Sequence, residues 1–558
     1  LNGDLFGMEF PEYIQRLGKM FYNQIVDQRK HETLQRKAPQ AKKILDTDYQ
    51  RVDINSMNHE QTREMGGEWL CQQAIQQLGL PSFLASQGFE QKDVHLAIAH
   101  LISRCVYPAS EYQTAQWMVE NSSVLELTQV NPQGLNHTKL YAISKKLFAI
   151  KDELEHFLSQ KTNELFDIED KILLYDLTNT YFEGRKQGSD MAGFGLSKER
   201  RSDAKLLVLA LVVNAEGFVK YSRICRGNLS DSKSLHQTIE EIKQAAYLNP
   251  GTRKPIIVMD AGIAVEDNLT MLRKEGWEYI CVTRSKLKEY TKAEPDKQPM
   301  LLHDKKGNPI EVLSVKKPGD TDNYLYVRSQ QKAVKEASME EHFSQRYEQE
   351  LDAVIAGIHK KGGTKKADKV WERIGRIKER YPSANKHYKI KVEADNGKVV
   401  HMDYNRKKSK KQTSQQQGVY FLRTNIEKID DTVFWRIYNT LTGIEATFRI
   451  LKTDLKFRPI FHQKDSSSMA HLFLAVLAYI VVHTIRYKLK ANGIKYDWQH
   501  IIRIMSTHKL ITTSIKNDKN RKIVLHKSSQ PTIECERIYK TLGYKQYPFR
   551  QKKFVLPE

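Results

Sequence analysis

The sequence predicts an α/β protein: a mixed sheet flanked by helices, interrupted by a β-containing insertion and preceded by a helical N-terminal domain. Three observations predict this fold. Apolar residues recur at helical spacing through residues 1–165, as in HLAIAHLISRCV and KLYAISKKLFAI. From Lys171 onward, short apolar runs separated by Gly, Asn and Asp indicate strands. Residues 286–415, rich in Lys, Glu and Gln, then break that pattern.

The order of elements after Lys171 follows from these runs. KILLYDL, KLLVLALVV and FVKYSRIC predict three strands; SDSKSLHQTIEEIKQAA predicts a helix, PIIVMD a buried strand, VEDNLTMLRKEG a helix and YICVTR another strand. IEVLSV, NYLYVR and KHYKIKVEAD are strand-like pieces of the insertion. VYFLRTN then predicts a strand, and a long helix is expected from about Asp430 to Leu455. The predicted regions are a helical domain (1–165), a core in two parts (166–285 and 416–492), an insertion with a charged exterior (286–415) and a C-terminal region (493–558).

The composition favours a nucleic-acid partner. At 558 residues the chain can form several domains, and its 89 Lys and Arg against 67 Asp and Glu give a net charge of +22. Such an excess attracts polyanions by counterion release and long-range attraction, and the helical domain is a candidate DNA-binding unit. The five cysteines form no CxxC pair, which predicts neither a zinc ribbon nor a disulfide framework and fits a reducing cytosol.

The most apolar stretch, MAHLFLAVLAYIVVHTI at residues 469–485, is about as long as the shortest membrane-crossing spans. It contains His471 and His483 and is flanked by charge, so we interpret it as a buried core helix, with a membrane anchor as the alternative. The N-terminus, LNGDLFGMEF, has no secretory-signal pattern, and the missing initiator Met suggests a trimmed or partial chain.

Three carboxylates are candidate catalytic groups. Asp176 ends the run KILLYDL and Asp260 ends PIIVMD, which places both at the carboxyl ends of strands, where open α/β sheets hold their ligands. Taken singly, each is as well explained as the cap of a turn or helix. The third, Glu445, lies in a predicted helix, and at about 100° per residue four side chains fall on or near its face: Tyr438, Leu441, Arg449 and Lys452. An ordinary surface ion pair of Glu445 with Arg449 is the alternative.

The combination favours metal-dependent chemistry on DNA. Two aspartates at strand ends and a glutamate on a cationic helix supply oxygen ligands alone, which suit Mg²⁺ or Mn²⁺. Two such ions can activate a water or a DNA 3′-hydroxyl and stabilise the leaving oxygen during displacement at phosphorus.

Four segments resemble bacterial insertion-sequence transposases of the DDE superfamily, in the insertion-sequence-four-like group that carries a β-rich insertion after its second Asp. They are LYDLTNTYFEG around Asp176, GNLSDSKSL at 227–235, VMDAGIAVEDN around Asp260, and Tyr438…Glu445…Lys452 leading into RPIFH. Together they span about residues 170–490.

The resemblance implies an RNase H-like core in which the first strand supplies Asp176, the fourth Asp260 and a late helix Glu445. It implies two Mg²⁺ or Mn²⁺ ions, with Asp176 touching both and Asp260 and Glu445 each holding one. The implied activity is cut-and-paste DNA transposition: strand cleavage at the ends of the element, then transfer of the freed 3′-ends to target DNA. A homodimer on double-stranded DNA in the bacterial cytoplasm, at the nucleoid, is the implied working state, and residues 493–558 are a candidate dimerisation region.

The sequence departs from this group at one position. Its glutamate helix usually reads Tyr, two residues, Arg, three residues, Glu, six residues, Lys; here Leu441 stands at the place of the Arg. Leucine cannot bind phosphate, so the contact is either absent or supplied by Arg449 or Arg436, and we expect Arg449. Lys452 resembles the family lysine that contacts terminal phosphates, and Tyr438 is expected to orient the backbone near the cut.

Other candidate groups are weaker. GFGLSKERRSD, between the first two predicted strands, carries Lys198, Arg200 and Arg201, which are expected to follow DNA or to form a plain solvated hairpin. The chain has no G-x-x-x-x-G-K-[ST] motif, so no nucleotide cofactor is expected. His462 and His471 lack paired ligand spacing and are expected in the core.

Two other functions agree with the same residues. A DNA-binding regulator derived from a transposase would explain the charge without any chemistry, and an RNase H-like nuclease would cut without rejoining. Metal-dependent DNA cleavage would exclude the regulator. Joining of pre-cut ends to target DNA would distinguish a transposase from the nuclease.

Overall fold

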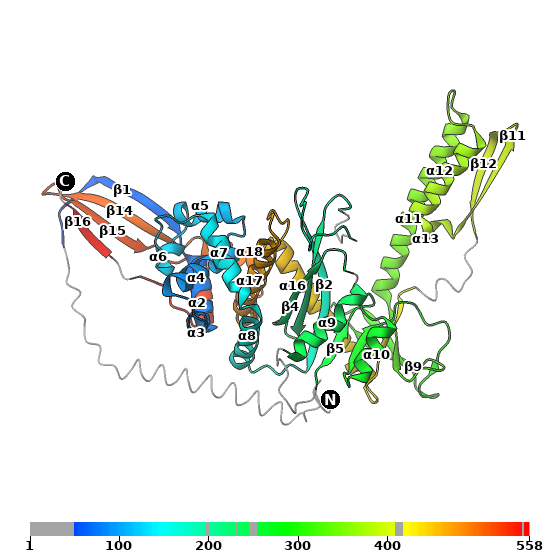
Figure 1. Cartoon of the computed structure of the whole chain (residues 1–558), viewed down its shortest axis with the longest axis horizontal. Helices are drawn as coiled ribbons and strands as arrows, with labels where there is room; N and C mark the ends of the chain where they lie inside the picture. The colour runs from blue at the N-terminus through cyan, green and yellow to red at the C-terminus, as the bar shows by residue number, and fades with distance from the viewer. Residues whose placement is uncertain are drawn as a thin grey trace. The chain divides into compact units, whose positions relative to one another are not determined.

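The computed structural model describes residues 49–195, 201–229, 231–244, 254–304, 306–407, 417–549 and 552–556, labelled in Figure 1. The chain divides into two compact units. Unit 1 comprises Leu1–Glu278 and Asn439–Glu558, and unit 2 comprises Tyr279–Tyr438. Unit 2 extends beyond the expected insertion, residues 286–415, at both ends, because it includes the strand predicted from YICVTR and the one predicted from VYFLRTN.

Residues 66–166 of unit 1 form helices, much as the apolar spacing predicts. Two of them start at side-chain caps: Ser110 accepts from the backbone N–H of Gln113, and Asn136 accepts from that of Lys139. The helices are α2 (Gly66–Gln77), α3 (Leu80–Ser86), α4 (Gln91–Val106), α5 (Glu111–Glu120), α6 (Val124–Thr128), α7 (His137–Ala149) and α8 (Lys151–Phe166).

The apolar stretch at 469–485 lies in α17 (Asp465–Ala491), which packs against α2, α4, α7 and α19 of the same unit. By length and composition α17 could cross a membrane, but 89% of its most apolar window is buried inside the protein. This burial agrees with the predicted core helix.

The first described strand, β1 (Val52–Glu64), lies in the region expected to be helical. It is the edge of an antiparallel sheet with the order β1-β14-β15-β16, whose other strands come from the C-terminal region: β14 (Lys509–Asn517), β15 (Lys522–Ser528) and β16 (Lys552–Leu556). Helices α18 (Trp498–Met505) and α19 (Ile533–Leu542) accompany them. The sequence of β1 is almost wholly polar and exposed, so no apolar alternation marks it as a strand.

The second sheet of unit 1 follows the predicted order of elements. Its strands are β2 (Ile172–Tyr181), β3 (Leu206–Asn214), β4 (Val219–Arg226) and β5 (Ile256–Met259), arranged β4-β3-β2-β5. The first three pair antiparallel, and β5 runs parallel to β2. Helices α9 (Asp231–Gln244) and α10 (Glu266–Lys274) follow β4 and β5 along the chain. All nine residues of β3 are buried, which is why it reads as an unbroken apolar run.

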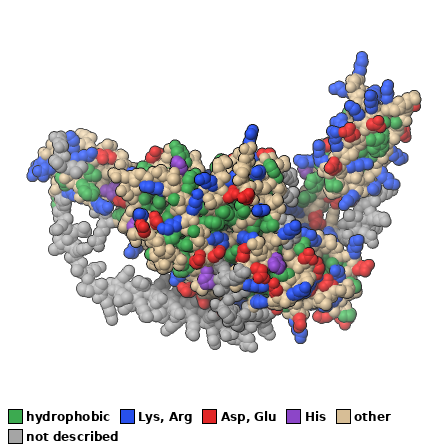
Figure 2. All heavy atoms as spheres, viewed as in Figure 1, with side chains coloured by type: hydrophobic (Ala, Val, Ile, Leu, Met, Phe, Trp, Pro, Cys, Tyr) green, Lys and Arg blue, Asp and Glu red, His purple; other side chains and the backbone are tan. Residues whose placement is uncertain are grey.

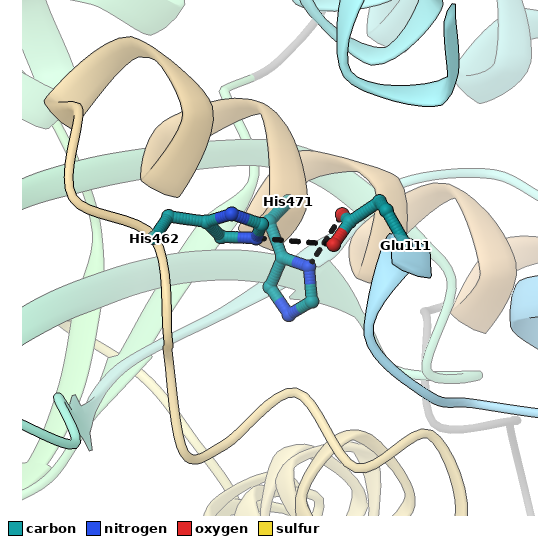
Figure 3. A group of neighbouring side chains, drawn as sticks. All are labelled: Glu111, His462 and His471. Carbon is teal, nitrogen blue, oxygen red and sulfur yellow. Dashed lines mark hydrogen bonds and ion pairs between the residues drawn. The ribbon is translucent and has the colours of Figure 1, made fainter. Parts of the chain in front are cut away.

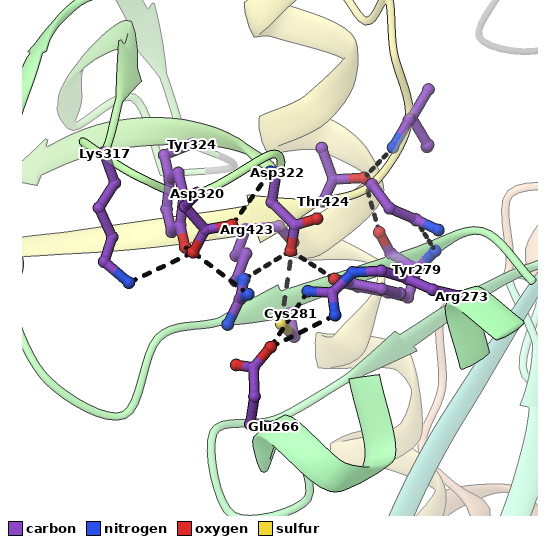
Figure 4. A network of polar contacts seen from close by, with 12 residues as sticks. Glu266, Arg273, Tyr279, Cys281, Lys317, Asp320, Asp322, Tyr324, Arg423 and Thr424 are labelled. Carbon is purple, nitrogen blue, oxygen red and sulfur yellow. Dashed lines mark hydrogen bonds and ion pairs between the residues drawn. The ribbon is translucent and has the colours of Figure 1, made fainter. Parts of the chain in front are cut away.

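Unit 2 has a sheet with the order β6-β13-β10-β9-β7, and β8 pairs with β9. The strands are β6 (Tyr279–Val282), β7 (Thr291–Lys292), β8 (Met300–His303), β9 (Pro309–Lys316), β10 (Asn323–Ser329) and β13 (Val419–Thr424). A polar network joins β6 and β13 to the turn before β10 (Figure 4): Arg423 pairs with Asp322 at 2.6 Å, and the Tyr279 hydroxyl donates to the same carboxylate at 2.5 Å. Asp322 is 2% exposed, so its negative charge is stabilised by Arg423 and the Tyr279 hydroxyl rather than by water.

An arm, residues 330–406, extends from this sheet (Figure 1). It consists of α11 (Gln330–His359), α12 (Ala367–Arg380), α13 (Pro382–Asn385) and the hairpin β11 (Tyr388–Asp395) with β12 (Lys398–Arg406). The arm has its own hydrophobic core, to which both long helices and the hairpin contribute. The strand β11 was predicted, whereas the two long helices were not. The signal was available, because residues 330–356 contain neither Gly nor Pro and are rich in helix-forming residues.

The glycines beside the start of β3 lie where backbone segments leave no room for a side chain. The backbone of Gly193 pairs in both directions with Leu206, and the Gly227 N–H donates to the Met191 carbonyl at 3.0 Å. A Cβ at Gly227 would lie 1.9 Å from the Leu206 carbonyl oxygen, and one at Gly195 would lie 2.5 Å from that of Gly227. Three backbone segments therefore approach closely where GFG and GNLSD meet the start of β3.

We predict that Gly227→Ala destabilises unit 1 by about 3 kcal/mol, because the new methyl group must displace backbone rather than a flexible side chain. The matched control is Gly375→Ala in the interior of α12, where nothing lies within 4 Å of the added Cβ. This control should stabilise the arm by about 0.5–1 kcal/mol through helix propensity. Denaturant unfolding measures both effects, and equal midpoints for Gly227→Ala and the wild type would contradict the steric argument.

Candidate active site

Strand register brings the first two candidate carboxylates together. Strands β2 and β5 run parallel, and their last registered pair is Tyr175 opposite Met259. Asp176 directly follows Tyr175, and Asp260 directly follows Met259, so the two aspartate backbones lie side by side, about 5 Å apart. Both side chains are half-buried. Asp260 follows the end of β5 as predicted, whereas β2 continues past Asp176 to Tyr181 through its pairing with β3.

Local hydrogen bonds orient both carboxylates. Oδ1 of Asp176 accepts from the N–H of Leu177 at 2.7 Å. Oδ1 of Asp260 accepts from Gly262 and Ile263 at 2.9 and 3.2 Å, at the turn that leads to α10. The turn-capping role expected of a lone aspartate is therefore present at Asp260. Because it occupies one oxygen, the cap also fixes the direction in which the other oxygen points.

Glu445 lies on α16 (Leu441–Arg449), which packs against β2. At Gly443 the helix faces the strand, since a Cβ there would be 3.8 Å from the side chain of Leu174 on β2. The buried face of α16 includes Thr447, whose hydroxyl bonds that of Tyr479 on α17 at 2.8 Å. Glu445 and Arg449 stand one turn apart on the exposed side of the helix, as their spacing predicts.

The long helical stretch expected from about Asp430 to Leu455 is present, but it is interrupted at Thr440. The structure has α15 (Asp431–Asn439), a break at Thr440, α16, and a π-helical turn at Ile450–Asp454. At the break, the Thr442 hydroxyl donates to the Asn439 carbonyl at 2.9 Å, a bond that competes with regular helix pairing.

The break changes the predicted face. Tyr438 lies on α15 in unit 2, and not on the helix of Glu445. Of the predicted shared face, the part that α16 contains is the pair Glu445 and Arg449. Leu441 is half-buried at the start of α16, and Arg436 is exposed on α15. Lys452 lies in the π-helical turn, where the wider i→i+5 spacing alters its angular position relative to Glu445; such turns are frequent at functional sites.

A buried lysine holds the segment that follows this helix. Lys186, 2% exposed, donates to the carbonyls of His462 and Gln463 at 3.1 and 2.5 Å and pairs with Asp465 at 3.1 Å. Burial alone would raise the pKa of Asp465, but hydrogen bonds from Ser189 and Lys186 lower it. The RPIFH segment is thereby tied to the loop after β2. No periodicity or motif in the sequence singled out Lys186.

The basic loop between β2 and β3 is described only in part. Lys198 and Arg200 lie outside the described residues. Arg201 makes two 2.9 Å hydrogen bonds to Asp203, pairs with Glu183 at 3.5 Å and lies over the Tyr181 ring. Arg201 is therefore engaged within its own hairpin.

A second group of potential ligands lies elsewhere in unit 1. Glu111, His462 and His471 place ligand atoms within 4.8 Å of one another (Figure 3), and all three are buried. The His471 Nδ1 is 3.1 Å from Glu111 Oε1, and the His462 Nε2 is 3.4 Å from Oε2. Burial alone would raise the pKa of Glu111, but the two histidines lower it, so it remains an anion.

The contact with Arg104 determines which nitrogen of His471 carries the proton. The Arg104 Nη2 lies 3.2 Å from the His471 Nε2, and because a guanidinium has only donors, that nitrogen must accept. The Nδ1 of neutral His471 then carries the proton and donates to Glu111. Burial, with Arg104 alongside, lowers the pKa of His471 to about 4, which keeps it neutral at pH 7. The group is thus a hydrogen-bonded network joining α4, α5 and α17, in keeping with the core positions expected for both histidines.

The three carboxylates fit hard divalent cations by donor chemistry, since they offer only oxygens at half-buried or exposed positions. Over the described ranges, they do not form a group whose ligand atoms all lie within 4.8 Å. A two-ion arrangement does not require that spacing, because the outer two carboxylates hold different ions.

A sheet of three antiparallel strands with a fourth parallel to the first, and with acidic residues where the parallel pair ends, defines an RNase H-like fold. The family model described as "Transposase DDE domain" matches residues 170–481, more than half of the chain. The chain belongs to this family. No curated protein matches it in sequence.

Two solved structures to which the chain shows a distant likeness are transposase complexes. The piggyBac transposase synaptic complex with hairpin DNA is 7% identical, with a TM-score of 0.35 and 82% of each chain covered. The Mos1 transposase paired-end complex with left transposon end is 13% identical, with a TM-score of 0.15, covering 31% of this chain and 53% of that one. These low scores contribute nothing to the assignment of individual residues.

The histidines of unit 1 predict a dependence of stability on pH. His483, half-buried on α17, bonds the Glu216 carbonyl at 2.9 Å, and removal from water lowers its pKa to about 4. The unfolded chain takes up a proton near pH 6.5, whereas the folded chain does so only near pH 4. Stability is therefore fully present above pH 6.5 and falls as the pH drops toward 4.

We predict that the free energy of unfolding falls by about 2 kcal/mol less between pH 7 and pH 5 in His483→Gln than in the wild type. Glutamine can still donate a hydrogen bond to the Glu216 carbonyl, but it takes up no proton. Urea unfolding at both pH values measures this difference. His401→Gln, at an exposed position in the arm, is the control and should leave the pH dependence unchanged. An unaltered pH dependence in His483→Gln would show that this side chain is not held neutral.

Proposed function

We propose that this transposase performs cut-and-paste transposition of an insertion sequence, cleaving DNA strands at the element's ends and joining the freed 3′-ends to target DNA. Asp176, Asp260 and Glu445 are the proposed catalytic and metal-binding residues. The observation that carries the proposal is the register of β2 and β5, which sets the two aspartates side by side, while the Glu445 helix packs against β2, the strand of Asp176.

In this proposal each side chain has a separate task. The three carboxylates would hold two Mg²⁺ or Mn²⁺ ions, with Asp176 contributing to both and Asp260 and Glu445 to one each. When bound, the ions supply activation of the attacking hydroxyl and stabilisation of the leaving oxygen. The turn hydrogen bonds of Asp260 and the packing of α16 preset the carboxylates before DNA arrives, so little reorganisation is needed.

Cations on α16 and on the π-helical turn that follows it bind the DNA backbone. Arg449, exposed one turn from Glu445, takes the phosphate contact that Leu441 cannot make, and Lys452 contacts the terminal phosphates. Tyr438 orients the backbone near the cut. The spacing of Tyr438, Glu445 and Lys452 supports membership of the insertion-sequence-four-like group. The proposed working state is a homodimer on paired ends in the bacterial cytoplasm, at the nucleoid.

We predict that Asp176→Asn, Asp260→Asn and Glu445→Gln each reduce Mg²⁺- or Mn²⁺-dependent cleavage at least 1,000-fold, roughly the loss of a main source of transition-state stabilisation. The substrate is DNA carrying the inverted repeats that flank the coding region, and the readout is nicked and joined products on gels. DNA binding in EDTA should persist, since no variant removes a cation.

The control for these variants is Asp267→Asn, an exposed carboxylate in the first turn of α10 near Asp260 in sequence. It should cleave like the wild type. Cleavage that survives in all three candidate variants would refute the site. Binding without any metal-dependent cleavage by the wild type would favour a regulator, and cleavage without joining of pre-cut ends would favour a nuclease.

We further predict that Arg449→Gln weakens binding to a pre-cut end about 10-fold at low salt and lowers the slope of log K against log [salt] by about 1, as expected for one lost phosphate contact. Arg436→Gln, on α15, tests the rival position. A larger loss with Arg436→Gln than with Arg449→Gln would assign the contact to Arg436.

A further inference from the structure

The far end of the arm carries an unusual concentration of positive charge. The tip, residues 360–369 and 395–398, contains six lysines and two aspartates. Figure 2 shows Lys and Arg side chains gathered over this part of unit 2. The lysines are Lys360, Lys361, Lys365, Lys366, Lys369 and Lys398, and all are exposed.

The two segments of the tip are joined by backbone hydrogen bonds. The Ala367 N–H donates to the Gly397 carbonyl at 3.0 Å, and the Val399 N–H donates to that of Lys365 at 2.7 Å. Lys366 and Lys398 form an isolated β-bridge at the same place. The lysines at the start of α12 therefore lie beside the turn of the hairpin on a shared rigid frame.

Several acidic residues of the arm have partners away from the tip. Glu350 pairs with Arg380 at 2.7 Å, and Glu341 with Arg406 at 3.3 Å. The Tyr404 hydroxyl donates to Asp352 at 2.8 Å. By contrast, among the described residues, none of the six tip lysines has an ion pair. Holding like charges together without compensation costs free energy, and a polyanion would recover it.

An exposed aromatic side chain borders this charge. Trp371, in the second turn of α12, is 45% exposed, whereas the other five tryptophans of the chain are at most 9% exposed. The buried face of α12 includes Val370 and Ile374, so Trp371 points away from the core of the arm. A large ring among cations suits a partner that offers phosphates and sugar or base surfaces together.

From these observations we infer that the arm tip is a second DNA-binding surface, which grips the phosphate backbone of a duplex through its lysines while Trp371 packs against the sugars. The inference rests on the proposed function in that the ligand is DNA. The contact does not depend on base sequence, because lysine binds phosphate as a point charge. No part of the proposed catalytic site contributes to it.

The test compares two fourfold variants of the full chain. The tip variant is K361Q/K365Q/K366Q/K369Q. The matched control, K288Q/K306Q/K335Q/K428Q, removes the same charge from exposed lysines of unit 2 outside the tip. Binding of a 60-base-pair duplex of arbitrary sequence is measured in EDTA across a range of salt, so that no chemistry is needed.

The tip variant should bind at least about 30-fold more weakly at 0.1 M salt, with a slope of log K against log [salt] lower by about 3. The control should lose less than about threefold. Equal losses in the two variants would overturn the inference, because net charge rather than the tip would then be responsible. The duplex would be the wrong ligand if the wild type bound single-stranded DNA more tightly than duplex DNA and the tip variant lost that preference.

Trp371 supplies an independent readout. Because the other tryptophans are buried, duplex DNA should quench the emission of the exposed one, and Trp371→Phe should abolish that change while retaining most of the affinity. Quenching that persists in Trp371→Phe would count against the tip. If the wild type cleaves DNA but the tip variant binds as the wild type does, this inference alone is refuted. If the tip variant binds more weakly but the wild type shows no metal-dependent cleavage, the proposed function alone is refuted.

Discussion

The parallel pairing of β2 with β5 is the constraint on which the candidate site depends. Parallel neighbours bring successive residues into register, so one pair, Tyr175 with Met259, determines where the next two residues lie. Residues 84 positions apart in the chain thereby become neighbours. The rest of unit 1 supports this pairing: β3 and β4 extend the sheet on one side, and α16 covers β2.

Much of the core could be predicted because its sequence signals are local. Buried strands such as β3 are continuous apolar runs, and the strand–helix alternation from β2 to β6 follows directly from them. The helix break at Thr440 could not be predicted in this way, because apolar spacing continues through it and the cause is a hydroxyl bond to the backbone. Strand β1 could not be predicted either, since its partner β14 lies at the other end of the chain.

The candidate site shows the same division. The strand-end position of Asp260 and the shared helical face of Glu445 and Arg449 could be predicted from local patterns, whereas Asp176 lies within β2 rather than at its end. Lys186 and the Arg104–His471–Glu111 network could not be predicted, because each depends on contacts between distant segments. These buried polar groups hold the helices and the RPIFH segment in one arrangement, since leaving any partner unpaired in the interior is costly.

The sheet that joins β1 to β14 has a consequence for how the protein comes into being. Glu64 and Lys509, paired across it, are separated by 445 residues. At a synthesis rate of about 5–20 residues per second, β1 waits for tens of seconds before its neighbour leaves the ribosome. Its largely polar surface suits that interval, because an exposed apolar edge would aggregate. Prematurely terminated chains would lack this sheet, so only full-length products could complete the fold of unit 1.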